Sequence, residues 1–150
     1  MQDERTKYRS TLISILVSHT EEARTTLVAA LTKLPNNARE IQFGVHPNQD
    51  PDGMFSVVLH LDGPDLFSLN KAIEGHRVLF DAYTRGETAA NDLPMFDPFD
   101  QPFSVNDVIV EVAADWLEKI WGTLDKKADC PPALIFGEDG WGTGMPRHLS

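Results

Sequence analysis

The residues best suited to catalysis or metal binding are two histidines, His46 and His60, which lie in stretches where apolar and polar residues alternate. Side chains of a strand point alternately to its two faces, so both histidines are expected opposite the apolar face. On paired strands they could approach each other, and with an acid such as Asp62 they could form a metal or acid–base site, but the hairpin register that would bring them together is not fixed by the sequence. The chain contains no GxSxG, HExxH or GxGxxG motif. A small hydrolase or metal-dependent enzyme using His46, His60 and acidic neighbours is therefore the alternative hypothesis.

A cluster of oxygen-bearing side chains lies between these two stretches. Asn48, Asp50, Asp52 and Gly53 match the first half of a calcium-binding loop, in which oxygen ligands at alternate positions precede a glycine. The position that should supply a bidentate glutamate is Leu59, inside an apolar run. We therefore interpret the segment as the turn of a β-hairpin and predict no metal ligands.

Cys130 is the only cysteine, which excludes an internal disulfide framework and any multi-cysteine metal site. Lys126 and Lys127 precede it, and their charges are expected to lower the pKa of the thiol slightly. The glycine-rich tail, residues 137–150, lacks the Lys-Ser/Thr pair of a phosphate-binding loop. No catalytic residue and no cofactor is predicted.

The net charge of −10 is unevenly distributed along the chain. Residues 1–46 carry six Lys/Arg and five Asp/Glu, whereas residues 47–150 carry seven Lys/Arg and eighteen Asp/Glu. The span 86–118 holds eight acids and no base. Such a field repels phosphate backbones, which disfavours nucleic-acid binding, and it attracts a basic protein.

Residues 85–103 form an irregular stretch with three prolines, which predicts a long loop held onto the core by Phe96, Phe99 and Phe103. The leading hypothesis is a non-catalytic protein-binding domain that docks a basic partner through the acidic 87–118 face. In size and charge it is similar to bacterial immunity proteins, which act as inhibitors of basic nuclease toxins. The predicted partner-binding residues are Asp97, Phe99, Asp100, Asp107, Glu111 and Asp115.

Residues 104–124 organise the fold because their apolar residues follow the one-sided spacing of an amphipathic helix. Ser104 is the expected N-cap, with Asp107 three residues later. A strand over 108–112 leading into a shorter helix is the alternative, since valines alternate there. Trp116 and Trp121 exceed what one side of a small helix usually buries, so a homodimer is a third hypothesis.

The other elements follow from periodicity. Residues 3–34 predict one long helix or two in tandem with a break at 18–19. Residues 39–46 and 54–61 predict a hairpin, and 133–136 a short strand. Residues 76–83 predict a third strand after a short helix, or the end of a continuous helix over 65–83.

These elements predict a single α+β domain over residues 1–150. We expect an antiparallel sheet of three or four strands, with the long N-terminal helix and the tryptophan-bearing helix packed on one face. No apolar run is long enough to cross a bilayer, and the N-terminus lacks the apolar segment of a signal peptide. A cytoplasmic location without membrane contact is therefore expected.

Overall fold

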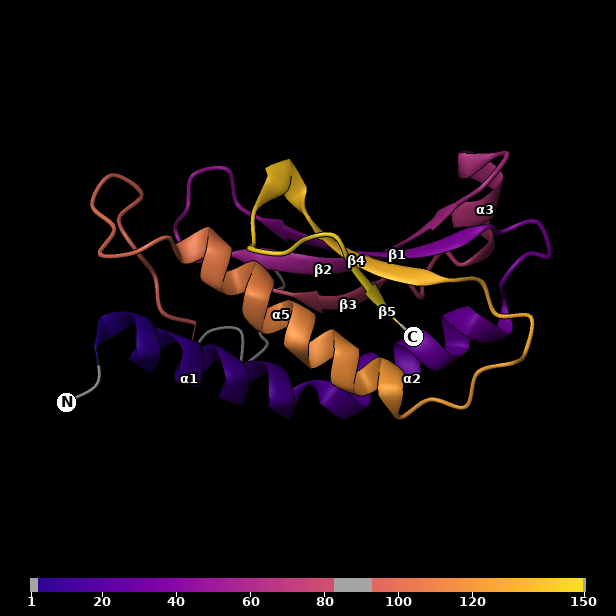
Figure 1. Cartoon of the computed structure of the whole chain (residues 1–150), viewed down its shortest axis with the longest axis horizontal. Helices are drawn as coiled ribbons and strands as arrows, with labels where there is room; N and C mark the ends of the chain where they lie inside the picture. The colour runs from indigo at the N-terminus through magenta and orange to yellow at the C-terminus, as the bar shows by residue number, and fades with distance from the viewer. Residues whose placement is uncertain (1–2, 83–92, 150) are drawn as a thin grey trace.

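A computed structural model describes residues 3–82 and 93–149, in which helices pack on one side of a twisted sheet (Figure 1). The strands lie in the order β3-β2-β1-β4-β5. In chain order, the elements are α1 (Glu4–Ser18), α2 (Thr20–Thr32), β1 (Glu40–Pro47), β2 (Phe55–Asp62), α3 (Leu66–Ala72), β3 (Val78–Asp81), α5 (Val105–Gly122), β4 (Ala133–Gly137), the 3-10 turn η1 (Glu138–Gly140) and β5 (Arg147–Leu149).

The α+β class is confirmed, but the prediction of an antiparallel sheet with three or four strands is wrong. The sheet has five strands and is mixed, because β4 runs parallel to β1 while the other pairs are antiparallel. α5 connects β3, at one edge of the sheet, to β4, which lies beside β1. It crosses the face of the sheet that the helices cover, and β4 therefore runs in the same direction as β1. The unpredicted fifth strand, β5, pairs with β4 through three residues near the C-terminus.

The N-terminal helical region is two helices, not one. Asp3 caps α1 by accepting a hydrogen bond from the Thr6 amide at 2.7 Å, which satisfies one of the free donors of the first turn. The His19 amide bonds back to the Leu16 carbonyl and marks the break before α2. The His19 ring packs edge-on against Phe80.

α5 forms over the whole stretch 105–122, which excludes the strand alternative for 108–112. Trp121 is 4% exposed and packs its ring edge-on against Phe43 of β1. Trp116 is also buried, and its Nε1 donates to Thr20 Oγ1 of α2 at 3.0 Å. Both tryptophans are thus inside this chain, packed against the sheet and the N-terminal helices.

The β1–β2 hairpin places alternate residues on opposite faces, as its sequence predicts. Ile41, Phe43 and Val45 of β1 are buried beneath the helices, and β2 buries its own alternate residues opposite them. At the edge, a bulge between Val57 and Val58 interrupts pairing with β3. The bulge leaves Val78 52% exposed, although alternation predicts that it shares a face with buried Phe80.

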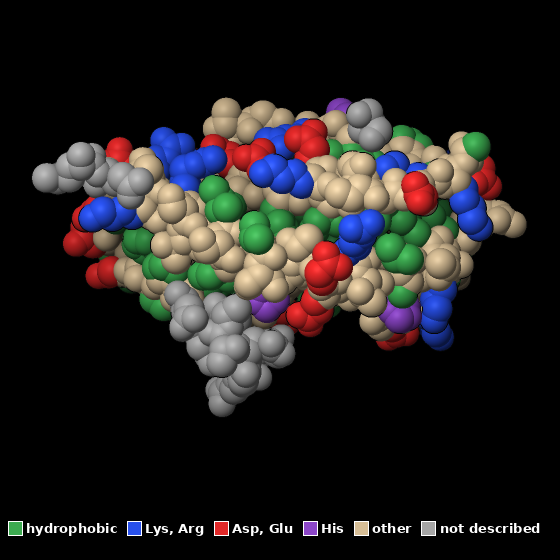
Figure 2. Space-filling view, turned by 90° about the horizontal axis from the view of Figure 1, so that it is seen from below, with side chains coloured by type: hydrophobic (Ala, Val, Ile, Leu, Met, Phe, Trp, Pro, Cys, Tyr) green, Lys and Arg blue, Asp and Glu red, His purple; other side chains and the backbone are tan. Residues whose placement is uncertain are grey.

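Seen from its helical side, the molecule carries charges of both signs around a discontinuous set of hydrophobic side chains (Figure 2). Ile13 and Val17 of α1 and Val28 of α2 are among the exposed large hydrophobic residues. None of the helices built from the described residues is both long and apolar enough to cross a membrane.

Candidate functional site

The segment that leads into α5 is held against the N-terminal helix by an aromatic cluster. Phe96 meets the Tyr8 ring edge-on at 4.9 Å between centroids, and Phe103 lies 5.6 Å from the same ring. The Phe96 amide also donates to the Asp52 carbonyl of the hairpin loop at 2.9 Å. Aromatic contacts of this kind stabilise by about 0.5–1.5 kcal/mol each beyond area burial, so residues 96 and 103 fix both ends of a short exposed turn.

The turn between these anchors presents Phe99 to solvent. The prediction that Phe99 helps hold the loop onto the core is wrong, because Phe99 is 94% exposed, whereas Phe96 and Phe103 pack against the core. Its amide donates to Asp97 Oδ1 at 2.9 Å, and the Asp100 amide donates to the Asp97 carbonyl at 3.1 Å. The Gln101 side chain donates to the Pro51 carbonyl. These bonds define a turn, so the exposed ring lies on ordered backbone between two exposed carboxylates.

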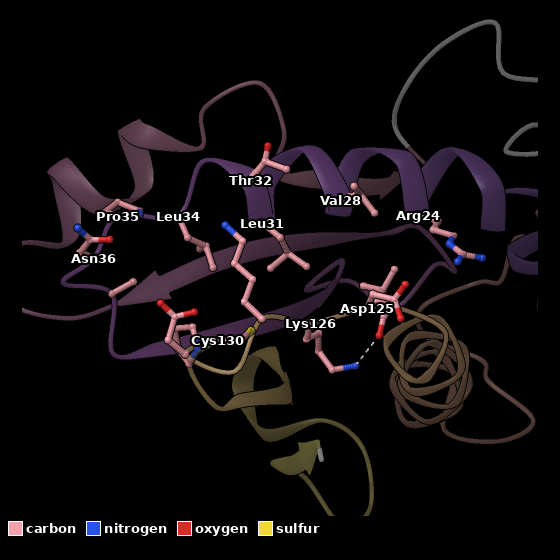
Figure 3. Close-up of a pocket in the computed structure, with 15 residues that line it drawn as sticks. Arg24, Val28, Leu31, Thr32, Leu34, Pro35, Asn36, Asp125, Lys126 and Cys130 are labelled. Carbon is pink, nitrogen blue, oxygen red and sulfur yellow. Dashed lines mark hydrogen bonds between the residues drawn. The ribbon is translucent and has the colours of Figure 1, made fainter.

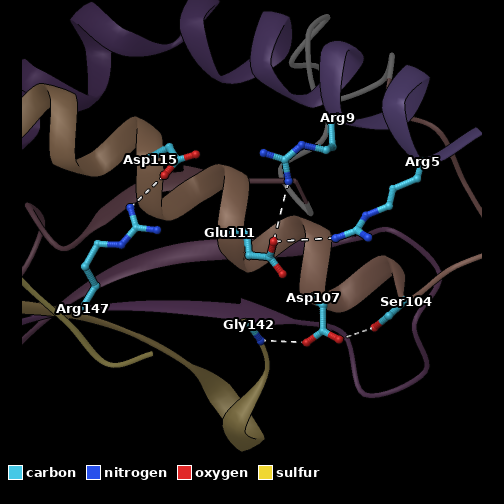
Figure 4. Close-up of polar contacts among 8 residues, drawn as sticks. All are labelled: Arg5, Arg9, Ser104, Asp107, Glu111, Asp115, Gly142 and Arg147. Carbon is cyan, nitrogen blue, oxygen red and sulfur yellow. Dashed lines mark hydrogen bonds and ion pairs between the residues drawn. The ribbon is translucent and has the colours of Figure 1, made fainter. Parts of the chain in front are cut away.

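Asp107 has a structural partner set within the chain (Figure 4). One carboxylate oxygen accepts from Ser104 Oγ at 2.7 Å, and the other accepts from the Gly142 amide at 2.8 Å. Ser104 is the N-cap of α5 by position, as predicted, but its hydroxyl accepts no backbone N–H of the helix, so the first bond links the two side chains without forming a capping box. The second connects α5 to the C-terminal segment, whose half-buried Trp141 packs on the core.

Two more acids predicted to bind a partner form ion pairs inside the molecule. Glu111 lies between Arg5 and Arg9 of α1, at 3.8 and 3.7 Å (Figure 4). Asp115 accepts from Arg147 Nη1 of β5 at 2.8 Å. Each such pair neutralises one charge of the predicted acidic face, so this part of α5 has a weaker field than its sequence indicates.

Together, these contacts divide the six predicted partner-binding residues into two groups. Asp97, Phe99 and Asp100 lie on the exposed turn, whereas Asp107, Glu111 and Asp115 have partners elsewhere in the chain. The predicted 87–118 face also includes residues 87–92, which lie outside the described residues.

The two histidines singled out by the sequence do meet on the sheet face opposite the helices. Their Nε2 atoms are 3.0 Å apart, and the rings are nearly perpendicular. They meet above Gly44, where a Cβ would come within 2.6 Å of His46 Nε2 and 2.8 Å of Phe136 Cζ. A side chain at position 44 would therefore separate the rings.

The groups on either side of the histidines differ from the predicted Asp62. His60 Nδ1 lies 2.7 Å from Arg77 Nη2, and His46 Nδ1 lies 3.2 Å from Glu138 Oε1. A guanidinium can only donate, so His60 Nδ1 must accept and its proton resides on Nε2. That proton is donated to His46 Nε2, which leaves the His46 proton on Nδ1, facing Glu138. The four side chains form one chain of donors, Arg77 to His60 to His46 to Glu138.

Burial lowers the pKa of His60 to about 4, with further contributions from the Arg77 charge and from His46. Because the pKa of His60 is about 4 in the folded state and 6.5 in the unfolded state, the unfolded state binds more protons between pH 4 and pH 6.5. The contribution of neutral His60 to the free energy of unfolding is therefore complete above about pH 6.5 and declines as the pH falls toward 4.

We therefore expect wild-type protein to lose about 1–2 kcal/mol of stability, relative to a His60→Gln variant, between pH 7.5 and pH 4.5, after allowance for partial solvent screening. Urea denaturation of both proteins at several pH values measures this difference. A gap between the two proteins that stays constant with pH would contradict the assignment of neutral, hydrogen-bonded His60.

The arrangement of His46 and His60 does not favour metal binding. The two Nε2 atoms point at each other, and the remaining nitrogen of His60 faces the cationic Arg77. Among the described residues, no group of three or more His, Cys, Asp or Glu side chains could hold a metal ion. In the hairpin loop, the Asp52 carboxylate accepts from the Met54 amide and the Asn48 side chain, so these groups stabilise the turn itself.

Cys130 lies beside a cavity between α2 and the loop that joins α5 to β4 (Figure 3). The sequence predicts a slightly lowered pKa for its thiol, and this is wrong. Burial raises the pKa of Cys130 and outweighs the opposing charge of Lys126, while Asp129 raises it further. A neutral thiol is a poor nucleophile. The sequence contains no signal for this cavity, because its walls come from segments far apart in the chain.

Comparison with known proteins assigns a family but no activity. Residues 3–149 match a family described as a family of unknown function, DUF6389, and the chain belongs to that family. No curated protein and no solved structure matches the chain.

Proposed function

We propose that this chain is a non-catalytic protein-binding domain that docks a basic partner through the turn formed by residues 96–103, with Phe99 as the anchor. The observation that supports this most strongly is the exposure of Phe99, 94%, on a turn fixed at both ends. A large aromatic side chain gains little for the isolated fold in this position. In a pocket of a partner it would be buried, and phenylalanine is among the aromatic residues enriched at the cores of protein interfaces.

The surroundings of Phe99 support a basic partner. Asp97 and Asp100 flank the ring, are exposed, and form no ion pair with the described residues. The net charge of −10 adds a long-range field that speeds encounter with a positive surface. Because the turn is already ordered by hydrogen bonds and by the Phe96–Tyr8 contact, little conformational entropy is lost on docking.

The acids of α5 have a secondary role in this proposal. Asp115 remains 54% exposed despite its bond to Arg147, so it contributes to steering more than to contact. A small acidic domain of this kind suits the masking of a basic protein, as an inhibitor or immunity protein does. Self-association remains a third hypothesis, and with both tryptophans buried it would use other exposed hydrophobic residues, such as Val17.

The test compares two exposed phenylalanines. Wild-type protein, Phe99→Ser and Phe67→Ser are used as baits in extracts of the native cell; Phe67 is the matched control, since it is 75% exposed but lies on α3. A partner captured by wild type is purified, and its affinity for each bait is measured. We expect Phe99→Ser to weaken binding roughly 30-fold or more, as for an interface anchor, and Phe67→Ser to leave it within about twofold.

The charge component is tested with the same partner. Raising the salt concentration from about 50 to about 500 mM should weaken binding to wild type, because exposed charges are screened. Asp97→Asn and Asp100→Asn together should reduce that salt dependence. A partner retained equally by Phe99→Ser, or one whose binding does not respond to salt, would contradict the proposal.

The alternative, an acid–base enzyme using His46 and His60, is favoured by one observation, the 3.0 Å approach of the two imidazoles. Glu138 and the two imidazoles are the groups of this chain that can exchange a proton, whereas Arg77 stays charged and orients His60 through its Nδ1. The cavity beside Cys130 has none of these four residues in its walls. Loss of a measured activity in His46→Ala, without loss of partner binding, would favour the enzyme over the binding domain.

A further inference from the structure

A cavity of about 580 Å³ opens between α2 and the loop over residues 124–131. Figure 3 shows Val28 and Thr32 of α2 on one side, with Lys126 and Cys130 on the other. Its size lies within the range of roughly 300–1,000 Å³ that is typical of small-molecule sites. Its lining residues within 124–131 follow the C-terminal end of α5, whereas the turn over residues 96–103 precedes the N-terminal end of that helix. Figure 1 shows these two ends far apart, so the cavity is separate from the proposed protein-docking site.

The cavity wall is about equally polar and apolar, and its apolar part is incompletely covered by the protein itself. Leu31, Leu34 and Cys130 pack on the core but remain partly accessible, and Val28 is 43% exposed at the cavity wall. A hydrophobic ligand that covered these side chains would remove apolar surface from water, at about 25 cal/mol per Å². The walls therefore favour a ligand with an apolar body.

The polar groups around the cavity select the charge of that ligand. Arg24, Lys126 and Lys127 line it together with Asp125 and Asp129, so its charge balance is positive in a chain of net charge −10.

The two cations available to a ligand are Arg24 and Lys127. Lys126 is occupied, since its Nζ donates to the Trp121 and Leu124 carbonyls at the end of α5. Arg24 uses one nitrogen to bond the Thr123 carbonyl at 3.2 Å, and its other donors make no bond to the part of the chain that the structure describes. Lys127 forms no ion pair with the described residues.

We propose that this cavity binds a small amphiphilic anion, whose apolar body lies on Val28, Leu31 and Leu34 and whose carboxylate or sulfonate is held by Arg24 or by Lys127. Guanidinium and carboxylate groups form charge-assisted, often bidentate hydrogen bonds, which give orientation as well as affinity. The apolar contacts supply most of the binding energy, and the two cations select an acid over an uncharged analogue.

The test uses two fluorescent probes with the same ring system. 8-Anilinonaphthalene-1-sulfonate carries one anionic group, and N-phenyl-1-naphthylamine is its uncharged counterpart. We expect one saturable site for the sulfonate, with affinity at least about fivefold higher than for the amine. Absence of a saturable site for the sulfonate, or equal affinity for the two probes, would overturn the proposal.

Variants localise the site and its charge selectivity. Of Lys127→Gln and Arg24→Gln, the variant that removes the cation holding the sulfonate should weaken sulfonate binding about three- to tenfold, and both should leave the amine unchanged; no effect of either variant would overturn the proposal. Lys33→Gln is the matched control, because Lys33 ends α2 but does not line the cavity. Leu31→Trp should fill the cavity and abolish binding of both probes. If Leu31→Trp folds and both probes still bind as to wild type, the site lies elsewhere and the proposal fails.

Cys130 supplies an independent readout because it is the only thiol in the chain. Saturating sulfonate should slow its reaction with N-ethylmaleimide at least about fivefold, since the probe covers the cavity wall. The exposed-surface control Lys33→Gln should show the same protection. A thiol that reacts at an unchanged rate in the presence of bound probe would place the probe outside this cavity and overturn the assignment.

Discussion

Replacement of Trp121 by alanine should lower the free energy of unfolding by about 3–5 kcal/mol, the range for a large aromatic residue removed from a packed core. The side chain is 4% exposed and contacts the Phe43 ring of β1, so its loss opens a cavity between α5 and the sheet. Lys126 Nζ also lies 4.8 Å from the Trp121 ring centroid and loses a cation–π contact in the variant.

Urea denaturation followed by far-UV circular dichroism measures this loss, because the signal does not depend on tryptophan fluorescence. Phe99→Ala is the control: it also removes an aromatic ring, but from an exposed position, and should change stability by less than about 0.5 kcal/mol. A Trp121→Ala protein within about 1 kcal/mol of wild type would show that α5 is not packed on the sheet as described.

Helix α5 could be predicted because its apolar residues recur at helical spacing along the whole segment. The alternating valines over 108–112, which suggested a strand, also have a physical explanation. Val110 is off the main stripe yet fully buried, since the C-terminal segment covers it where Gly142 approaches. Burial on a second side adds apolar residues between those of the stripe. Val108, Val110 and Val112 therefore alternate in a helix that is covered from two directions.

The direction of β4 and the existence of β5 could not be derived from local patterns. The run 133–136 is readily predicted as a strand, but its pairing with β1 depends on how α5 returns the chain across the sheet. β5 consists of three residues, Arg147–Leu149, two of which are polar or charged. Its formation depends on the docking of the preceding segment, which brings it beside β4.

In the candidate sites, too, local sequence patterns did not predict contacts between segments that are far apart in the chain. Strand alternation predicted that His46 and His60 share a face, but the register that brings them together came only from the structure. Gly44 permits their approach, and their partners Glu138 and Arg77 come from other elements. The charge of α5 was overestimated because it was counted along the sequence. Folding brings Arg5 and Arg9, from the slightly basic N-terminal part, against Glu111.

A Gly142→Val substitution should release the C-terminal segment from α5. Gly142 has φ +93°, which side chains rarely adopt, and a Cβ there would lie 2.9 Å from the Val110 Cβ and closer still to Val110 Cγ1. Backbone strain and overpacking together should destabilise the docked segment by about 2–5 kcal/mol. The Gly142 amide would also withdraw from Asp107, which it bonds at 2.8 Å in the native fold.

Hydrogen exchange distinguishes this local release from global unfolding. In Gly142→Val, the amides of β5 and of the β4 edge that pairs with it should exchange much faster, while those of β1 and β2 keep most of their protection. Gly144→Val is the matched control, because Gly144 has φ +78° but open space around it. It carries the strain without the clash and should lose only about 1–2 kcal/mol. Equal effects of the two substitutions would mean that the contact with Val110 does not hold the segment, and that backbone conformation alone determines its docking.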